Sequence, residues 1–360
     1  MKILFITPYS SEGASNRYRV EQYLPYLKHN GFECHISPFV SSEFYKIIYR
    51  NKYRSKKVYY FFKGLIKRIS DIMKMHCYDI IFIHREACPF GPPVFEWLIY
   101  KFRRPMIFDF DDAIFMQNFN PANKIYSFLK FPSKVKHIIK MSTCVIVANR
   151  FLEAYARKYN ANVYIIPTAI DTERFLPLKA NSIKLTIGWI GSPTTAPYLS
   201  VVFNAMQKLS QDYSFVLKII GAGQKVIIKG VNVENFDWQL ESEIEDFQNI
   251  DIGIYPITDT LWSFGKAGFK AIQYMSVGVP VVASPVGITK EIIQDGINGF
   301  LANSDGEWVE KISRLIEEPD RRGIIGLAAR KTVEDKFSVK VNAPKYLQIF
   351  YKAYHSRQKH

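Results

Sequence analysis

The chain has 360 residues, a length that suits two domains of ordinary size. Hydrophobic residues make up 48% and charged residues 22%, which excludes a disordered chain and indicates a soluble globular protein. The net charge of +15 is uneven, because residues 1–180 hold 28 Lys and Arg against 14 Asp and Glu, whereas residues 181–360 hold 20 against 19. An acidic partner is therefore expected for the first half.

The cysteines and the apolar runs narrow the possible classes of protein further. Cys34, Cys77, Cys88 and Cys144 lie far apart and form no C-x-x-C pair, which argues against a zinc site or a disulfide framework and fits a reducing cytosol. No stretch approaches the roughly 20 apolar residues of a membrane span, and the start of the chain shows no secretory signal. We expect a cytoplasmic protein, either free or peripheral on the inner face of the cell membrane.

Short apolar runs alternate with helical patterns along the first half. Strands are predicted at 2–7, 33–37, 79–84, 105–109, 143–148 and 163–166. Helices are predicted at about 16–30, 58–75, 92–102, 121–140 and 149–159. Continuous apolar strands separated by helices indicate a parallel sheet covered on both faces.

The second half begins this alternation afresh after a linker, PTAIDTERFLPLKANS. Strands are predicted at 183–190, 215–220, 231–234, 250–255, 279–283 and 299–302, and helices near 195–210, 241–248, 266–277, 289–294, 305–317 and 320–335. The expected fold is α/β, with two Rossmann-like doubly wound domains at 1–170 and 171–337. A final helix within 338–360 is expected to pack back onto the first domain. Ligands of such sheets bind at the carboxyl ends of the strands.

The segment FGKAGFKAIQYM (264–275) is the first candidate site. Lys266 and Lys270 are four residues apart and would share a face of the predicted helix. Gly265 and Gly268 would let backbone approach a ligand, and the free N–H groups of a helix N-terminus favour phosphate. Two glycines in a loop and two solvated lysines need no ligand, so the segment alone leaves both interpretations open.

The residues that follow this segment favour one of the two interpretations. Gln273 begins the run QYMSVGVPVVAS, then come GITKEII with Gly287 and Glu291, and GINGFL from Gly296. This succession resembles the nucleotide-sugar segment of the fourth glycosyltransferase family, the group 1 enzymes, which are retaining and have the two-domain GT-B fold. The segment VIVANRFLEAYARKYNANVYIIPTAIDTERFLP is similar to the end of that family's first domain. The resemblance covers most of residues 140–340.

The sequence also departs from the family pattern, in which two glutamates eight positions apart belong to this loop and helix. Gly265 and Gln273 stand in their places, so a ribose would meet an amide without charge assistance. The basic pair that grips the diphosphate is absent from GWIGSPTTAPYL. The resemblance, to a divergent G-K-x-x-F-K branch, implies that the lysines replace these cations. The implied donor-binding residues are Gly191, Ser192, Thr194, Lys266, Gly268, Phe269, Lys270 and Gln273.

In the first half, FDFDD (108–112) follows a strand, so Asp109, Asp111 and Asp112 are expected at the carboxyl edge of the sheet. A D-x-D metal site belongs to a different, single-domain fold, so no metal is expected. By the family register, Asp111 or Asp112 occupies the place of a donor-contacting His, and we assign both, with Lys266, as catalytic. The alternative is that Asp112 merely caps the next segment.

Three further stretches carry weaker signals. His84 and Arg85 end a strand, and Arg17 and Arg19 lie in SNRYRV with Asn16 as an N-cap. We assign these four charged or ionisable residues to the acceptor side, although a structural His and a solvated helix start are equally good interpretations. Trp238 would line a base pocket or the core, and Glu241, Glu243 and Glu245 are expected on a solvated face.

Residues 46–74 hold ten basic residues and one acidic residue, Asp71, interleaved with aromatic and aliphatic ones. This composition fits a helix resting on anionic lipid. It also suits nucleic acid, but no nucleic-acid fold surrounds it, so a membrane is preferred and no nucleic-acid partner is expected. The bland alternative is a solvated helix packed by its aromatic side.

The sequence thus predicts a retaining glycosyltransferase of hexosyltransferase type, which moves sugar from a nucleoside-diphosphate sugar to a glycan or lipid-linked acceptor in bacterial surface polysaccharide or glycolipid synthesis. No cofactor beyond the donor is expected. A sugar-nucleotide epimerase of similar fold and a non-catalytic nucleotide-sugar-binding protein remain alternatives. A dehydrogenase is disfavoured, because GWIGSPT and IIGAGQK each lack a full G-x-G-x-x-G.

Overall fold

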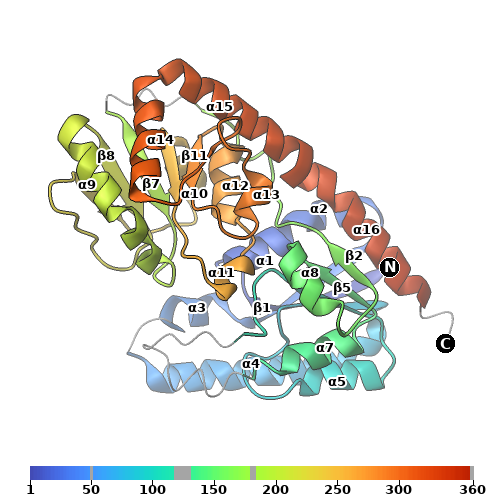
Figure 1. Cartoon of the computed structure of the whole chain (residues 1–360). Coiled ribbons are helices and arrows are strands. Elements are labelled where there is room, and N and C mark those ends of the chain that lie inside the picture. Colours follow the sequence, from blue (N-terminus) through green and yellow to red (C-terminus); the bar gives the residue numbers. More distant parts are fainter. Residues whose placement is uncertain (49–51, 117–130, 179–183, 357–360) are drawn as a thin grey trace. The chain divides into compact units, whose positions relative to one another are not determined.

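A computed structural model describes residues 1–48, 52–116, 131–178 and 184–356. Parts of five predicted segments lie outside these residues, namely 121–130 of a helix, 49–51 of the basic stretch, 179–182 of the linker, residue 183 of a strand and 357–360 of the C-terminal segment. The chain divides into two compact units, Met1–Ala169 with Asn342–His360, and Ile170–Val341. Each unit contains one six-stranded sheet whose described strand pairs are all parallel (Figure 1).

The first sheet has the order β2-β1-β3-β4-β5-β6. Its strands are β1 (Lys2–Tyr9), β2 (Glu33–Val40), β3 (Ile80–His84), β4 (Met106–Phe110), β5 (Cys144–Val147) and β6 (Val163–Ile165). β3, β4 and β5 are buried along their whole length, as their predominantly apolar sequences predict, and the buried polar residues in them are His84 and Asp109. The order changes direction between β1 and β3, so a ligand site is expected at the carboxyl ends of these two strands.

The helices of the first unit are α1 (Ala14–Arg19), α2 (Leu24–His29), α3 (Ser42–Ile48), α4 (Arg54–Lys74), α5 (Val94–Lys101), α7 (Lys134–Met141) and α8 (Arg150–Ala156), with 3₁₀ turns η1 (Glu21–Tyr23) and η2 (Met75–Cys77). The single helix predicted at 16–30 is thus wrong, because Val20 breaks it with φ −126°. α16 (Val339–Ser356) returns to this unit, where its Tyr346 ring lies 4.3 Å from Tyr23 and its Phe350 ring 6.0 Å from Phe5.

The second sheet has the order β12-β11-β10-β7-β8-β9. Its strands are β7 (Thr186–Ile190), β8 (Val216–Ile220), β9 (Val233–Phe236), β10 (Ile252–Tyr255), β11 (Val281–Ala283) and β12 (Phe300–Leu301). The chain runs outward through β7, β8 and β9 and then crosses to β10 on the other side of β7. The direction therefore changes between β7 and β10, which marks the loops after these strands as the expected site.

The helices of the second unit are η4 (Ala196–Val202), α9 (Phe203–Asp212), α10 (Glu243–Gln248), α11 (Leu261–Phe264), α12 (Phe269–Ser276), α13 (Thr289–Ile292), α14 (Asp305–Glu317), α15 (Pro319–Thr332) and the π-helical turn η5 (Val333–Phe337). A core cluster with the fully buried Trp308 fills the space between the sheet and helices such as α9 and α14. Ser304 and Glu307 form a reciprocal capping box at the start of α14.

Candidate functional site

The loop after β7 is the first part of the site in the second unit. Ser192 donates its backbone N–H to Thr195 Oγ1 at 3.0 Å, and the hydroxyls of Ser192 and Thr194 lie 2.8 Å apart. Gly191 follows the strand directly, and a Cβ on Gly221 would lie 2.6 Å from the Gly191 carbonyl oxygen. Gly221 itself has φ +80°, so glycine is required where the β7 and β8 loops meet.

The loop before α12 is the second part. Gly268, with φ +64°, is the N-cap of α12, and the helix begins only at Phe269. The prediction that Lys266 and Lys270 share a helical face is therefore wrong, since Lys266 precedes the helix. Lys266 Nζ lies 5.6 Å from the centre of the Tyr198 ring, beside the β7 loop, whereas Lys270 Nζ lies 5.2 Å from the Phe247 ring of α10.

Gln273 does not present its amide to solvent. Its side chain is fully buried, and its Nε2 donates to Glu243 Oε1 at 3.4 Å. The expectation of direct ribose contact through Gln273 is corrected on this ground, because the amide lies below the surface. The expectation of a solvated Glu243 is wrong too, since only 5% of this residue is exposed. Glu241 and Glu245 are exposed as predicted.

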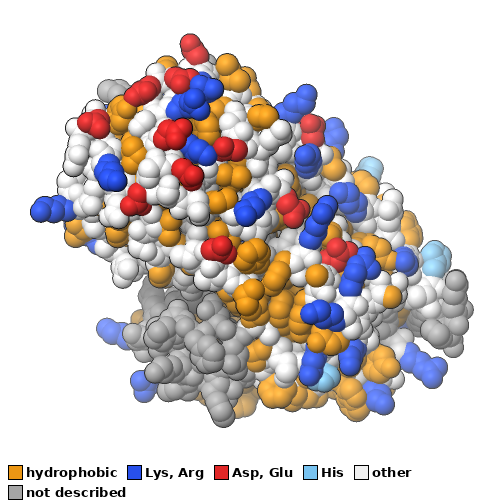
Figure 2. Space-filling model, viewed as in Figure 1, with side chains coloured by type: hydrophobic (Ala, Val, Ile, Leu, Met, Phe, Trp, Pro, Cys, Tyr) orange, Lys and Arg blue, Asp and Glu red, His pale blue; other side chains and the backbone are white. Residues whose placement is uncertain are grey.

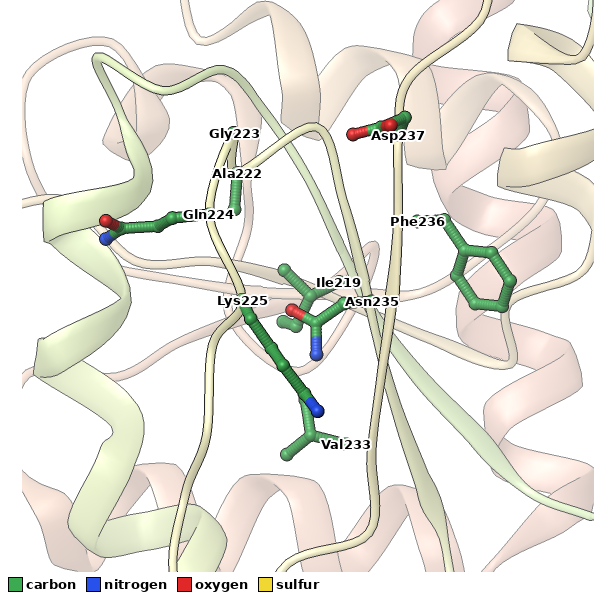
Figure 3. A pocket seen from close by; sticks show the side chains of 9 residues that line it. All are labelled: Ile219, Ala222, Gly223, Gln224, Lys225, Val233, Asn235, Phe236 and Asp237. Carbon is green, nitrogen blue, oxygen red and sulfur yellow. The ribbon is translucent and has the colours of Figure 1, made fainter.

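A cavity of ≈ 530 Å³ opens at the carboxyl ends of β8 and β9 (Figure 3). It is lined by Ile219, Ala222, Gly223, Gln224, Lys225, Val233, Asn235, Phe236 and Asp237. Asn235 fixes one wall, because its side chain accepts from the Val226 N–H at 2.8 Å and donates to the Val226 carbonyl at 3.0 Å. Sequence reasoning missed this cavity, because IIGAGQK lacks a full G-x-G-x-x-G and was weighed only against a dehydrogenase. Two glycines directly after a strand were the available signal.

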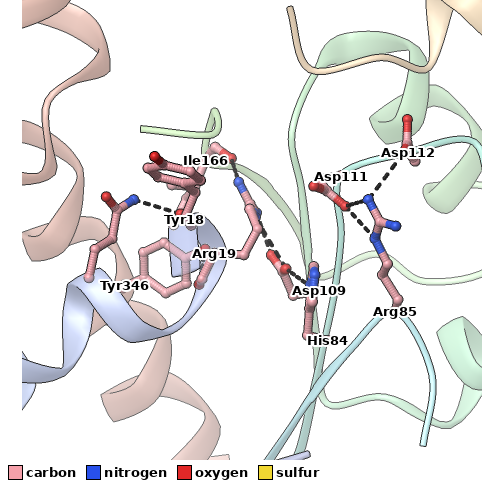
Figure 4. A network of polar contacts seen from close by, with 10 residues as sticks. Tyr18, Arg19, His84, Arg85, Asp109, Asp111, Asp112, Ile166 and Tyr346 are labelled. Atoms are coloured by element: carbon pink, nitrogen blue, oxygen red, sulfur yellow. Dashed lines mark hydrogen bonds and ion pairs between the residues drawn. The ribbon is translucent and has the colours of Figure 1, made fainter. Parts of the chain in front are cut away.

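A cluster of mostly buried charged residues of the first unit lies at the carboxyl ends of β3 and β4 (Figure 4). Arg19 is fully buried, forms an ion pair with Asp109 and donates to the Ile166 carbonyl at 2.7 Å. His84, also fully buried, lies with Nδ1 2.7 Å from Asp109 Oδ2. The prediction that Arg19 offers a cation to an acceptor is therefore wrong, since Asp109 and backbone take up its donors.

Burial acts to raise the pKa of Asp109, but the Arg19 charge and the His84 hydrogen bond outweigh burial and lower it. The carboxylate is thus held ionised between two partners. The side chain of His84 is placed by Asp109, which favours its structural interpretation.

Arg85 forms a second cluster next to the first. Its backbone has φ +62°, a strained conformation for a non-glycine residue, and its N–H donates to the Asp109 carbonyl at 2.7 Å. The guanidinium donates to Asp111 Oδ1 at 2.7 Å and to Asp112 Oδ2 at 3.0 Å. Burial acts to raise the pKa of Asp111, but the Arg85 charge lowers it to about 2. The three carboxylates of FDFDD thus face two different cations.

Arg17 is half-buried on α1 and donates to the Ser11 and Glu12 carbonyls at 2.8 and 3.2 Å. Asn16 is not the N-cap that the sequence suggested, because α1 begins at Ala14 and the buried Asn16 donates to Glu21 Oε1 at 2.7 Å. The predicted acceptor-side residues His84 and Arg85 therefore come together at one edge with Asp111 and Asp112, and Arg17 belongs to the neighbouring loop after β1.

Comparison with known proteins finds a family match within the second unit. Residues 184–318 match the family described as Glycosyl transferases group 1. The second unit is thus similar to the group 1 glycosyl transferases over this segment. An uncharacterized glycosyltransferase of Methanocaldococcus jannaschii is 36% identical over 88 residues, which are 24% of this chain and 22% of that protein.

Solved structures resemble the chain in fold over both units. Sucrose-phosphate synthase from Thermosynechococcus elongatus aligns with a TM-score of 0.68 at 16% identity, over 99% of this chain and 100% of that one. Anabaena HepE in complex with UDP aligns with a TM-score of 0.70 at 15% identity, over 98% and 100%. The predicted two-domain GT-B fold is confirmed.

Within the second unit, the matched segment contains every predicted donor-binding residue from Gly191 to Gln273. The structure brings Lys266 beside the loop after β7 and places Lys270 against α10. It removes Gln273 from the surface, where the amide instead contacts the buried Glu243.

Proposed function

We propose that this protein is a glycosyltransferase whose second unit binds a nucleoside-diphosphate sugar. One observation carries the proposal: within the family-matched segment, glycine backbone, hydroxyls and Lys266 lie in the loops that flank the β7/β10 switch point, and Lys270 lies in the first turn of the following helix, α12. Free N–H groups at the start of α12, which has no acidic residue in its first turn, add a favourable dipole for phosphate. HepE binds UDP and UDP-glucose, which makes uridine nucleotides the first probes.

In the proposed reaction, the bond between the anomeric carbon and the diphosphate oxygen breaks as a bond to the acceptor oxygen forms, with retention of configuration. The acceptor hydroxyl proton passes to the departing diphosphate. Lys266, Lys270 and the N–H groups of α12 would stabilise the charge that develops on that diphosphate. The Arg85, Asp111 and Asp112 cluster is proposed as the acceptor side, with a glycan or lipid-linked acceptor of bacterial surface polysaccharide or glycolipid synthesis.

The two lysines give the direct test. Each charge-assisted hydrogen bond to phosphate contributes about 1.5–3 kcal/mol, so Lys266→Ala and Lys270→Ala should each weaken nucleoside-diphosphate binding by roughly ten- to a hundredfold. Lys229→Ala, at an exposed position of the same unit, is the matched control. Calorimetric titration with UDP, GDP, ADP and dTDP measures the change. Unchanged affinity in both site variants would refute the assignment.

The alternatives differ in product. A transferase releases nucleoside diphosphate only when acceptor is added, an epimerase changes the sugar without acceptor, and a binding protein releases nothing. The family match favours the transferase over the epimerase.

We also propose that the first unit rests on an anionic membrane through α4. Along this helix Val58, Tyr59, Phe62, Ile66, Ile69 and Met73 form a stripe, each 53–72% exposed. The opposite face is held inward by the buried Arg68, which donates to the Thr7 and Ala87 carbonyls at 2.9 and 2.7 Å. On its inner side, Tyr60, Phe61 and Leu65 pack against a core cluster of the first unit, as the alternative of a helix packed by aromatic residues expects. The apolar stripe is a separate set of residues that stays exposed.

Cations border this α4 stripe. Lys56, Lys63, Lys67 and Lys74 are exposed on the same helix, and α5, which contacts α4, adds exposed Trp97 and Tyr100. Figure 2 shows Lys and Arg interspersed with hydrophobic side chains at its lower right, over α5 and α7. Apolar and aromatic side chains among cations suit the interface of an anionic bilayer. Among the described residues, no helix is long and apolar enough to cross a membrane.

Vesicle sedimentation tests the membrane proposal. The chain should sediment with phosphatidylglycerol-containing vesicles but not with phosphatidylcholine alone, and Phe62→Glu with Ile66→Glu should abolish this. Leu327→Glu, which changes an apolar side chain that is 72% exposed in the second unit, is the control. Absence of binding at low salt would overturn the proposal.

A further inference from the structure

The hydroxyl of a buried tyrosine on α12 contacts the strand that precedes the first loop of the site. Tyr274 is fully buried, and its ring centre lies 4.9 Å from that of Phe247. Its hydroxyl donates to the Gly188 carbonyl at 2.9 Å and accepts from the Ile190 N–H at 2.9 Å. Burial raises the pKa of Tyr274, so the hydroxyl keeps the proton that it donates. Both backbone groups belong to β7, and α12 is therefore tied directly to this strand.

The strand pairing shows what this hydroxyl replaces. Among the described residues, the pairing of β7 with β10 ends at Gly188 and Gly253, whereas β7 stays paired with β8 as far as Ile190. An added Cβ on Gly253 would lie 2.6 Å from Tyr274 Cγ, so the ring crosses β10 where only glycine leaves room for it. The Tyr274 hydroxyl thus satisfies backbone groups of β7 at the point where β7 and β10 cease to pair.

The two parts of the proposed diphosphate site begin at the two ends of this contact. Ile190 is the last residue of β7, so its fixed N–H sets where the loop with the Ser192 and Thr194 hydroxyls begins. Tyr274 follows Lys270 by four residues, about one helical turn, so the same contact sets where the first turn of α12 lies. We propose that Tyr274 is a positioning residue that fixes the loop after β7 and the N-terminus of α12 relative to each other. This inference rests on the proposed function, which assigns both elements to the diphosphate.

Comparison of a diphosphate with its nucleoside gives the test, because only the diphosphate would contact the two elements that Tyr274 joins. The intact chain is titrated calorimetrically with UDP, GDP, ADP and dTDP, and the corresponding nucleosides are measured by competition. Tyr274→Phe keeps the ring and removes both hydrogen bonds, so it should weaken diphosphate binding by about tenfold and change nucleoside affinity by less than about twofold. A loss of folded protein would lower both affinities by the same factor. Tyr213→Phe, which removes a hydroxyl that contacts Glu317 in the same unit, is the matched control and should preserve both affinities.

A second variant perturbs the same contact from β10. Gly253→Ala places a methyl group against the Tyr274 ring, so it should lower the ratio of diphosphate to nucleoside affinity as Tyr274→Phe does. In both variants the amide of Ile190 should exchange with solvent faster than in the wild type. A Tyr274→Phe protein with the wild-type ratio would overturn the inference and leave the proposed function intact. If the wild type binds none of the four diphosphates, the proposed function fails and the inference fails with it.

Discussion

Asp109→Ala is the sharpest probe of the first unit, because it leaves a buried cation without its counter-ion. Arg19 and Asp109 are both fully buried, and the aspartate also fixes His84. Removal of one partner from a buried pair costs about 3–5 kcal/mol, since the remaining charge keeps its desolvation penalty. By contrast, Lys2→Ala breaks a surface pair with Glu33, in which both side chains are more than half exposed, and should change stability only marginally.

Urea unfolding followed by circular dichroism measures the loss, and hydrogen exchange of peptides from β1 and β4 assigns it to the first unit. The double variant Arg19→Met with Asp109→Leu should recover most of the stability, because two apolar side chains replace both charges. If Asp109→Ala costs no more than Lys2→Ala, or if the double variant is worse than the single one, the account of this buried network is refuted.

Three further outcomes are expected. Because the pKa of Asp111 is lowered to about 2, its contribution to stability should be complete above about pH 4 and be lost as the pH falls toward 2; Arg85→Ala should flatten this part of an acid-unfolding curve. Gly268→Ala should cost more than about 1 kcal/mol in urea unfolding and weaken nucleotide binding, since φ is +64° and the new Cβ would lie 2.5 Å from Ile292 Cδ1; an unchanged midpoint would contradict this. Ser304→Ala should cost about 1 kcal/mol through its capping box and leave nucleotide affinity unchanged, as calorimetry can check.

The strands could be predicted because their signal is local. Buried parallel strands require continuous apolar runs, and IIFIH and CVIV are such runs. The start of α12 could not be placed as well, because Gly268 adopts a left-handed conformation that ends the preceding loop. From the sequence alone, GKAGFKAIQ is equally compatible with a helix that begins at Lys266.

The burial of charged residues was harder to predict from the sequence than the strands were. Arg19 and Glu243 look like surface residues by type, and each is buried only because of a partner far along the chain. Asp109 lies 90 residues after Arg19, and Gln273 lies 30 residues after Glu243. Neither pairing leaves a periodic pattern, so sequence reasoning places both side chains in solvent by default. The family resemblance drew attention to Gln273 but carried no information about Glu243.

Arg85 explains why a substitution that contacts no ligand should still alter the cluster at the carboxyl edge of the first sheet. Its left-handed backbone costs about 1–2 kcal/mol, and three contacts offset this cost. The N–H donates to the Asp109 carbonyl, and the guanidinium joins Asp111 and Asp112. Asp109 thus belongs to both clusters, through its side chain to Arg19 and His84 and through its backbone to Arg85. Any shift of β4 that lowers the desolvation cost of an unpaired Arg19 must also move Arg85, which orients Asp111 and Asp112. Asp109→Ala should therefore impair transfer to acceptor more than it weakens binding of nucleotide to the second unit.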